Sequence, residues 1–123
     1  MTERTLQGCR ILIVEDEYML ADDLRQEIED AGAVVLGPAP DAQSALELVG
    51  GETRIDGAVL DINLGGEVSY PIADALAARR IPFLFTTGYD ASALPGRYAH
   101  VTRCEKPLRV SAVRDAIGRE LHG

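Results

Sequence analysis

The sequence predicts an α/β fold, in which helices cover both faces of a five-stranded parallel sheet in a doubly wound arrangement. Short apolar runs recur along the chain, as expected for strands that are buried on both faces. Amphipathic segments lie between these runs, and regular alternation of strand and helix is typical of parallel sheets. The 123 residues fit one domain, so we expect a single domain over residues 1–123.

The first half of the chain contains two strand–helix units and a third strand. Residues 11–14 form the first strand, and a helix over residues 18–31 follows. The apolar positions of this helix are spaced by four: Leu20, Leu24 and Ile28. Residues 34–36 form the second strand, and Asp41 is expected to cap the second helix. The buried face of this helix would carry Ala45, Leu46 and Val49, and residues 58–60 form the third strand.

The third helix begins near Pro71, because proline suits the first turn of a helix. Its buried face carries Ile72 and Leu76. Arg79 and Arg80 would complement the negative end of its dipole.

The remaining strands are residues 83–85 and, more weakly, residues 101–104. The segment between them, residues 90–100, includes Pro95-Gly96 and leaves room for one or two helical turns, so the fourth helix is expected to be reduced. The last helix has an apolar stripe: Val110, Val113, Ile117 and Leu121.

The charge balance argues against several partners. Twenty acidic residues face twelve basic ones, giving a net charge of −8. This disfavours nucleic acid and anionic membranes as partners. No apolar run reaches the roughly 18 residues of a membrane span, and the N-terminus lacks a signal-peptide core. Cys9 and Cys104 suggest reduced thiols in a cytoplasmic protein. Eleven of the basic residues are arginine, which makes Lys106 the single lysine.

Chemistry is expected at the carboxyl ends of the strands, where open parallel sheets bind their ligands. Four of the five predicted strand ends carry polar side chains: Glu15 and Asp16, Asp61, Thr86 and Thr87, and Glu105 and Lys106. Each has an ordinary alternative: Asp16 as a helix cap, Asp61 as the cap of a turn through residues 63–66, the threonines as β-formers, and Lys106 as a solvated charge. Their conjunction at one edge favours a functional site.

Three converging carboxylates repel one another unless a cation joins them. Mg²⁺ prefers oxygen ligands and suits this set, with Mn²⁺ as a substitute. A carboxylate beside such a cation can attack phosphorus as a nucleophile. Lys106 and Thr87 are the types of residue that stabilise the oxygens of a transferring phosphoryl group.

These motifs, in their order and approximate spacing, resemble those of response-regulator receiver domains. They are Glu15-Asp16 after the first strand, Asp61-Ile62-Asn63-Leu64, Thr87-Gly88 and Lys106-Pro107. The resemblance covers about residues 10–121. It implies a flavodoxin-like sheet with strand order 2-1-3-4-5, and a bacterial two-component or phosphorelay protein that acts as a regulatory phosphoacceptor rather than an enzyme.

The resemblance also implies roles for individual residues. Asp61 would accept the phosphoryl group from a histidine kinase or a phosphotransfer protein. Asp16 would bind Mg²⁺ directly, Glu15 largely through metal-bound water, and the main-chain carbonyl of Asn63 would complete the protein ligands.

The other implied roles concern the phosphoryl oxygens. Thr87 would turn its hydroxyl inward; it is preferred to Thr86 because the small Gly88 follows it. Lys106 would pair first with Asp61 and then with the phosphoryl group, through a cis bond to Pro107.

The chain departs from most receivers in the switch region. Arg103 stands where an aromatic reporter is usual, and Tyr98 or Tyr89 is a candidate substitute. The segment Phe85-Thr86-Thr87-Gly88-Tyr89 resembles the FATGUY subgroup, whose members often pair with HWE-type kinases. We expect Tyr89 to slow loss of the phosphoryl group by excluding water, or to be only a packed loop aromatic.

Several alternatives stay open. The leading interpretation is a stand-alone receiver, a monomer or weak dimer with an unknown downstream protein partner. The alternative is a module excised from a larger hybrid kinase or regulator. A small Mg²⁺-dependent phosphohydrolase is disfavoured because Asn63 occupies the position where such enzymes need a general acid. A nucleotide or flavin binder is disfavoured because no glycine-rich phosphate loop follows the first strand.

Overall fold

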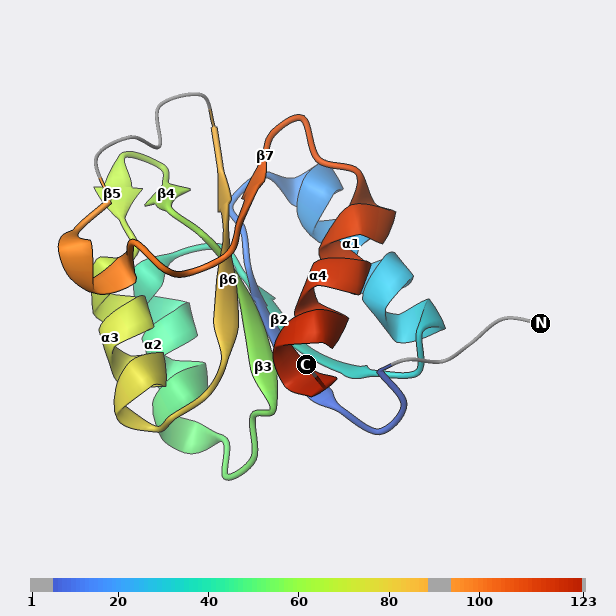
Figure 1. Cartoon of the computed structure of the whole chain (residues 1–123). Coiled ribbons are helices and arrows are strands. Elements are labelled where there is room, and N and C mark those ends of the chain that lie inside the picture. Colours follow the sequence, from blue (N-terminus) through green and yellow to red (C-terminus); the bar gives the residue numbers. More distant parts are fainter. Residues whose placement is uncertain (1–5, 89–93, 123) are drawn as a thin grey trace.

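The computed structural model describes residues 6–88 and 94–122, and a five-stranded parallel sheet forms its centre (Figure 1). The strand order is β2-β1-β3-β6-β7, which confirms the predicted order 2-1-3-4-5. The strands are β1 (Arg10–Val14), β2 (Val34–Ala39), β3 (Gly57–Asp61), β6 (Phe83–Thr87) and β7 (Arg103–Glu105).

Two pairs of helices cover the two faces of the sheet. One face carries α1 (Tyr18–Asp30) and α4 (Val110–His122), and the opposite face carries α2 (Ala42–Gly51) and α3 (Tyr70–Ala78) (Figure 1). None of the helices in the described part of the chain is long and apolar enough to cross a membrane.

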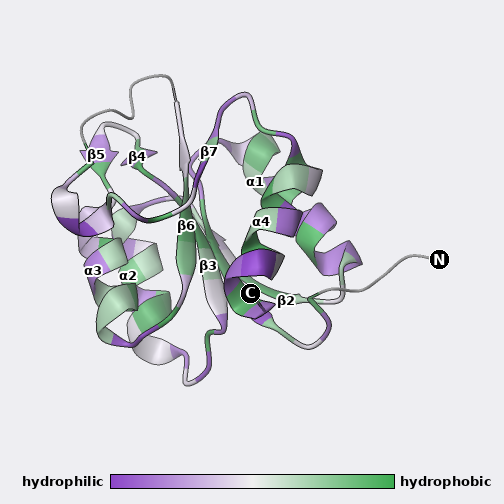
Figure 2. Ribbon diagram, viewed as in Figure 1, coloured by the Kyte–Doolittle hydropathy of each residue, from purple (hydrophilic) through white to green (hydrophobic). Residues whose placement is uncertain are grey.

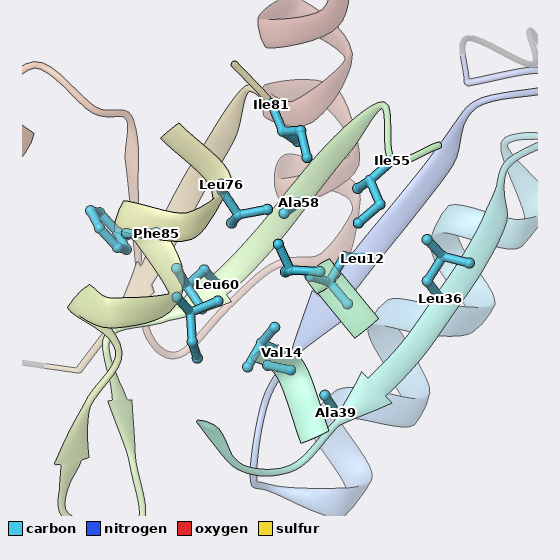
Figure 3. Close-up of a cluster of buried hydrophobic side chains, with 14 of the residues drawn as sticks. Leu12, Val14, Leu36, Ala39, Ile55, Ala58, Leu60, Leu76, Ile81 and Phe85 are labelled. Carbon is cyan, nitrogen blue, oxygen red and sulfur yellow. The ribbon is translucent and has the colours of Figure 1, made fainter. Parts of the chain in front are cut away.

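A separate apolar core lies on each face, because side chains alternate between the faces along each strand. Figure 3 shows the core under α2 and α3, which includes Leu12, Leu60 and Phe85. The core under α1 and α4 includes Ile13 and Leu84. Figure 2 shows the hydrophobic residues on the central strands and on the inward sides of the helices.

Two local predictions of strand bounds and burial need correction. The fifth strand begins at Arg103, two residues later than predicted, although the Thr102 carbonyl still accepts the Phe85 N–H at 2.9 Å. Leu46 is 39% exposed, because it lies about 100° around the helix from Ala45, which is buried. Asp41, by contrast, caps α2 as predicted by accepting the Ser44 N–H at 2.8 Å.

The predicted dipole role of Arg79 is also wrong. Its guanidinium donates to the carbonyl oxygens of Val49, Glu52 and Thr53, at the end of α2, and so ties α3 to its neighbour. Arg80 follows with a φ of 57°, outside the helix.

Two short elements lie near the carboxyl edge of the sheet. A hairpin of β4 (Asn63–Leu64) and β5 (Glu67–Val68), which the sequence analysis assigned to a loop, precedes α3 (Figure 1). The 3₁₀ helix η1 (Gly96–Tyr98) lies between β6 and β7. Within the described residues 94–102 it is a single short turn, as expected for a reduced fourth helix, whereas residues 90–93 of the predicted segment lie outside the described residues. Residues 89–93, including Tyr89, lie outside the described residues.

Gly37 permits an irregular end of β2. Its φ is +90°, and a Cβ atom there would lie 2.6 Å from the Ala39 nitrogen and 3.0 Å from the Ile13 carbonyl oxygen. The register between β1 and β2 shifts at this point. Because both neighbours are backbone atoms, no side-chain movement can relieve the contact.

We therefore expect Gly37→Ala to lower the free energy of unfolding by about 2 kcal/mol or more. Urea denaturation measures this change. Gly50→Ala is the matched control, because nothing lies within 4 Å of a Cβ there and alanine favours the helix. Equal stabilities of the two variants would contradict the expectation.

Candidate functional site

Three carboxylates converge at the carboxyl edge of the sheet, as predicted. β1 and β3 are neighbours with Val14 opposite Leu60, so the residues that follow, Glu15 and Asp61, lie at the same level. One carboxylate oxygen from each of Glu15, Asp16 and Asp61 lies within 4.8 Å of the other two. Glu15 is 2% and Asp61 3% exposed, whereas Asp16 is exposed. This arrangement concentrates negative charge in a partly buried place.

The ammonium of Lys106 joins two of these carboxylates. Its Nζ donates to Asp61 Oδ2 at 2.9 Å and to Glu15 Oε2 at 3.4 Å, and it lies 3.2 Å from Glu15 Oε1. The Lys106 side chain is 23% exposed. Lys106 is therefore not a solvated loop charge.

The acidic edge carries more negative charge than one ammonium offsets. Burial raises the pKa of Glu15 to about 7. The Glu17 N–H donates to Glu15 Oε2 at 3.0 Å and acts in the opposite direction, lowering this pKa. Asp61 raises this pKa further and Lys106 lowers it. Burial acts to lower the pKa of Lys106, but the hydrogen bond and charge of Asp61, together with Glu15, raise it overall. Within the described residues, Glu15 Oε1 accepts no hydrogen bond, although it forms an ion pair with Lys106 at 3.2 Å.

The hairpin borders the acidic edge on another side. The Asn63 N–H donates to Asp61 Oδ1 at 3.1 Å, and Asn63 Oδ1 accepts the Gly66 N–H at 2.9 Å. A Cβ atom on Gly65 would lie 3.7 Å from Asp16 Oδ2. Asp61 thus supports the turn while also facing Lys106, and the metal-ligand role of the Asn63 carbonyl stays a prediction.

The alternative role of Asp16 as a helix cap does not hold. The residue at the N-cap position of α1 is Glu17, which makes no capping hydrogen bond through its side chain. Asp16 instead lies among the acidic residues at the strand ends.

The two threonines at the end of β6 differ in their hydroxyl partners. Both are buried. The Thr87 hydroxyl donates to the Gly88 carbonyl oxygen at 3.0 Å, while its own carbonyl accepts the Lys106 N–H at 2.7 Å. The Thr86 hydroxyl has no partner among the described residues, a situation that costs about 1–3 kcal/mol in an apolar setting.

The remaining predicted residues lie around this edge. The Lys106–Pro107 bond is cis, as predicted, and Arg103 is exposed on β7. The roles assigned to Arg103 and Pro107 in switching stay predictions.

Tyr98 is the buried residue of η1, and its ring packs between those of Tyr70, Phe83 and Phe85 at centroid distances of 5.8–6.1 Å. Its hydroxyl donates to the Asp74 carboxylate on α3. Sequence reasoning named Tyr98 but missed Asp74, because nothing local links positions 24 residues apart.

The raised pKa of Glu15 predicts a pH dependence of stability without divalent metal. The folded state holds a proton on Glu15 up to about pH 7, whereas the unfolded chain releases it near the ordinary value of 4.5. Stability should therefore fall as pH rises through this window. Between pH 5 and pH 8 in EDTA, we expect the free energy of unfolding of Glu15→Gln to rise by about 2 kcal/mol relative to that of the wild type, as measured by urea denaturation.

Glu47→Gln, which removes an exposed carboxyl on α2, is the control and should follow the wild type. Parallel pH profiles for the wild type and Glu15→Gln would contradict the assignment.

Comparisons with known proteins identify relatives of this chain. No family model matches it. It is 32% identical over 110 residues to the phyllosphere-induced regulator PhyR of Methylorubrum extorquens, covering 84% of this chain and 41% of that protein. It is 33% identical over 88 residues to the sensory transduction protein LytT of Bacillus cereus, covering 69% of this chain and 35% of that protein. The chain therefore matches well under half the length of these two relatives.

Solved structures extend the likeness over nearly the whole chain. SdrG from Sphingomonas melonis Fr1 is 38% identical with a TM-score of 0.79, over 93% of this chain and 97% of that one. The response regulator PhyR from Brucella abortus is 26% identical with a TM-score of 0.77, over 97% of this chain and 51% of that one. A response regulator receiver protein from Sinorhizobium medicae is 23% identical with a TM-score of 0.81, over 96% and 98% of the two chains, and shares the fold.

The strand order, the acidic edge and these relatives agree. The chain belongs to the response-regulator receiver domains of two-component signalling.

Proposed function

We propose that this chain is a phosphoacceptor switch in which Asp61 accepts a phosphoryl group from a phosphohistidine. The observation that carries this proposal is the buried Asp61 carboxylate, held 2.9 Å from the Lys106 ammonium within a cluster of three acids. The acidic cluster supplies a nucleophile, and the ammonium supplies a positive charge for the transferred oxygens.

Glu15, Asp16 and Asp61 fit a magnesium ion. They offer hard oxygen ligands close together, and the buried Glu15 Oε1 lacks a hydrogen-bond donor among the described residues. We assign direct contact to Asp16 and Asp61, contact through water to Glu15, and one ligand to the main-chain carbonyl of Asn63. When bound, Mg²⁺ would neutralise charge on the phosphoryl oxygens. Mn²⁺ has a similar preference for oxygen.

The proposed transfer is a displacement at phosphorus. A carboxylate oxygen of Asp61 forms the new P–O bond, and the P–N bond to the donor imidazole breaks, with its electron pair returning to nitrogen. Lys106 moves its ammonium from Asp61 towards one phosphoryl oxygen. Thr87 turns its hydroxyl away from the Gly88 carbonyl and towards a second phosphoryl oxygen. Hydrolysis by water later restores the Asp61 carboxylate and releases phosphate.

The surface beside the acidic edge suits a protein donor. Tyr18 and Met19, at the start of α1, are exposed, and Met19 lines a groove together with Lys106, Pro107 and Leu108. A histidine kinase or a phosphotransfer protein would cover these side chains while presenting its phosphohistidine to Asp61. An HWE-type kinase is the donor we favour from the FATGUY resemblance.

We further propose that the switch involves Tyr98 in place of the usual aromatic residue. Tyr98 contacts Phe85, which lies two residues before Thr87 on the same face of β6. Tyr89 would shield the acyl phosphate from water, and Arg103 would border the responding surface. The downstream protein stays unassigned.

The unit of function that we propose is one receiver domain over residues 1–123, acting as a regulator without catalysis on external substrates. We propose a monomer or weak dimer. The cytoplasmic location stays a prediction.

Acetyl phosphate tests the acceptor directly. We expect the intact protein with Mg²⁺ to gain one phosphoryl group by mass spectrometry. Asp61→Asn and the wild type in EDTA should gain none, because the first lacks the nucleophile and the second lacks the metal. Labelling that persists in Asp61→Asn would contradict the proposal. Repeated turnover of external phosphoesters would instead favour the phosphohydrolase alternative.

Lys106→Arg tests the need for a compact ammonium. Arginine keeps the charge but presents a broad planar fork, which cannot move between carboxylate and phosphoryl oxygen in the same space. We expect the variant to fold, with unfolding free energy within about 1 kcal/mol of the wild type, and to be labelled by acetyl phosphate at least roughly tenfold more slowly. The exposed Arg119→Lys is the control. An unimpaired response in Lys106→Arg would count against the assigned role.

A further inference from the structure

Thr86 carries a buried hydroxyl that the proposed transfer does not use. Its side chain is 1% exposed, and Oγ1 has no hydrogen-bond partner among the described residues. Valine has the same shape without the unpartnered polar atom, so packing alone does not explain a threonine here.

The sheet register places Thr86 beside the residues of the acidic edge. It lies opposite Asp61 on β3 and opposite Cys104 on β7. Leu84, two residues earlier, packs in the core under α1 and α4. Because side chains alternate along a strand, Thr86 belongs to that same face.

The ion pair between Lys106 and Asp61 spans β6. β6 lies between β7 and β3, so the strands that lead to Lys106 and Asp61 are about two strand spacings apart, roughly 9–10 Å, and the two side chains together bridge this gap. Thr86 is the last side chain on that face of β6, since Gly88 has none. The register therefore places Thr86 on the strand that the Lys106–Asp61 ion pair spans.

The ammonium of Lys106 carries three N–H groups. In the described structure it lies 2.9 Å from Asp61 Oδ2 and 3.4 and 3.2 Å from the two carboxylate oxygens of Glu15. Departure of the ammonium from Asp61 would release an N–H group, for which Thr86 Oγ1 is an acceptor without a partner among the described residues.

We propose that Thr86 is a positioning residue for Lys106 in the phosphorylated state. When the ammonium leaves Asp61 for a phosphoryl oxygen, Thr86 Oγ1 accepts one of its N–H groups and holds it in place. This inference rests on the proposed function. In the unphosphorylated protein the buried Thr86 hydroxyl lacks a hydrogen bond, which is unfavourable. In the phosphorylated protein it gains one from Lys106.

Beryllofluoride with Mg²⁺ is the probe, because a beryllofluoride-activated conformation is known for the similar SdrG. The concentration for half-saturation is measured for the wild type, Thr86→Val and Thr86→Ser. Ser69→Ala is the matched control, since Ser69 also buries a hydroxyl without a partner within the described residues, at the start of α3. Lys106 is the single lysine, so ¹⁵N-lysine labelling gives one side-chain Nζ signal.

We expect Thr86→Val to fold with equal or greater stability and to need about tenfold more beryllofluoride. Its bound-state Nζ signal should differ from that of the wild type. Thr86→Ser keeps the hydroxyl and should match the wild type, as should Ser69→Ala.

Unchanged half-saturation in Thr86→Val would overturn the inference. Equal losses in Thr86→Val and Thr86→Ser would also overturn it, because they would indicate packing of the methyl group. A wild type that binds no beryllofluoride would overturn the proposed function, and this inference with it. Binding by the wild type that Asp61→Asn abolishes would leave the proposed function standing, whatever Thr86 does.

Discussion

The ion pair between Lys106 and Asp61 is the contact on which the rest of the site depends. It joins the end of β7 to the end of β3 across β6, so it forms only if three parallel strands finish at one edge in that order. Without Lys106, two buried carboxylates, Asp61 and Glu15, would lose their cationic partner. Breaking such a pair by removing one partner is strongly destabilising, because the remaining charge stays out of water. The ammonium is thus part of the fold as well as of the proposed chemistry.

The imbalance of charge at this edge is consistent with the proposed switch. One ammonium faces three carboxylates, and burial keeps the pKa of Glu15 near 7. The resting arrangement is therefore one of several ways to share a single positive charge among competing oxygens. A divalent cation would relieve the repulsion between the carboxylates, so that Lys106 would no longer be the only positive charge beside Asp61. A phosphoryl group would then offer the ammonium a new partner without leaving Asp61 as an unpaired buried anion.

Sequence reasoning predicted the features that depend on local pattern and on the general geometry of parallel sheets. Apolar runs predicted the strands. The rule that ligands bind at strand ends predicted that Glu15, Asp61 and Lys106 lie close together. It failed where a long-range contact decides the outcome. Arg79 binds carbonyls at the end of α2, and Asp74 binds the Tyr98 hydroxyl. Neither partner is recognisable from spacing, because only the packing of α3 brings them together.

Thr86 and Thr87 show how one strand end can serve two faces of a sheet. Neighbouring side chains on a strand point to opposite sides. Thr87 shares the face of Phe85, whose ring contacts Tyr98 in the core under α2 and α3. Thr86 shares the face of Leu84, in the core under α1 and α4, and lies opposite Asp61 in the sheet register. Under the proposed function, a change at Asp61 would act on both sides of the sheet through two adjacent hydroxyls, one on the face of the aromatic cluster and one on the opposite face. A single threonine could face only one of these sides.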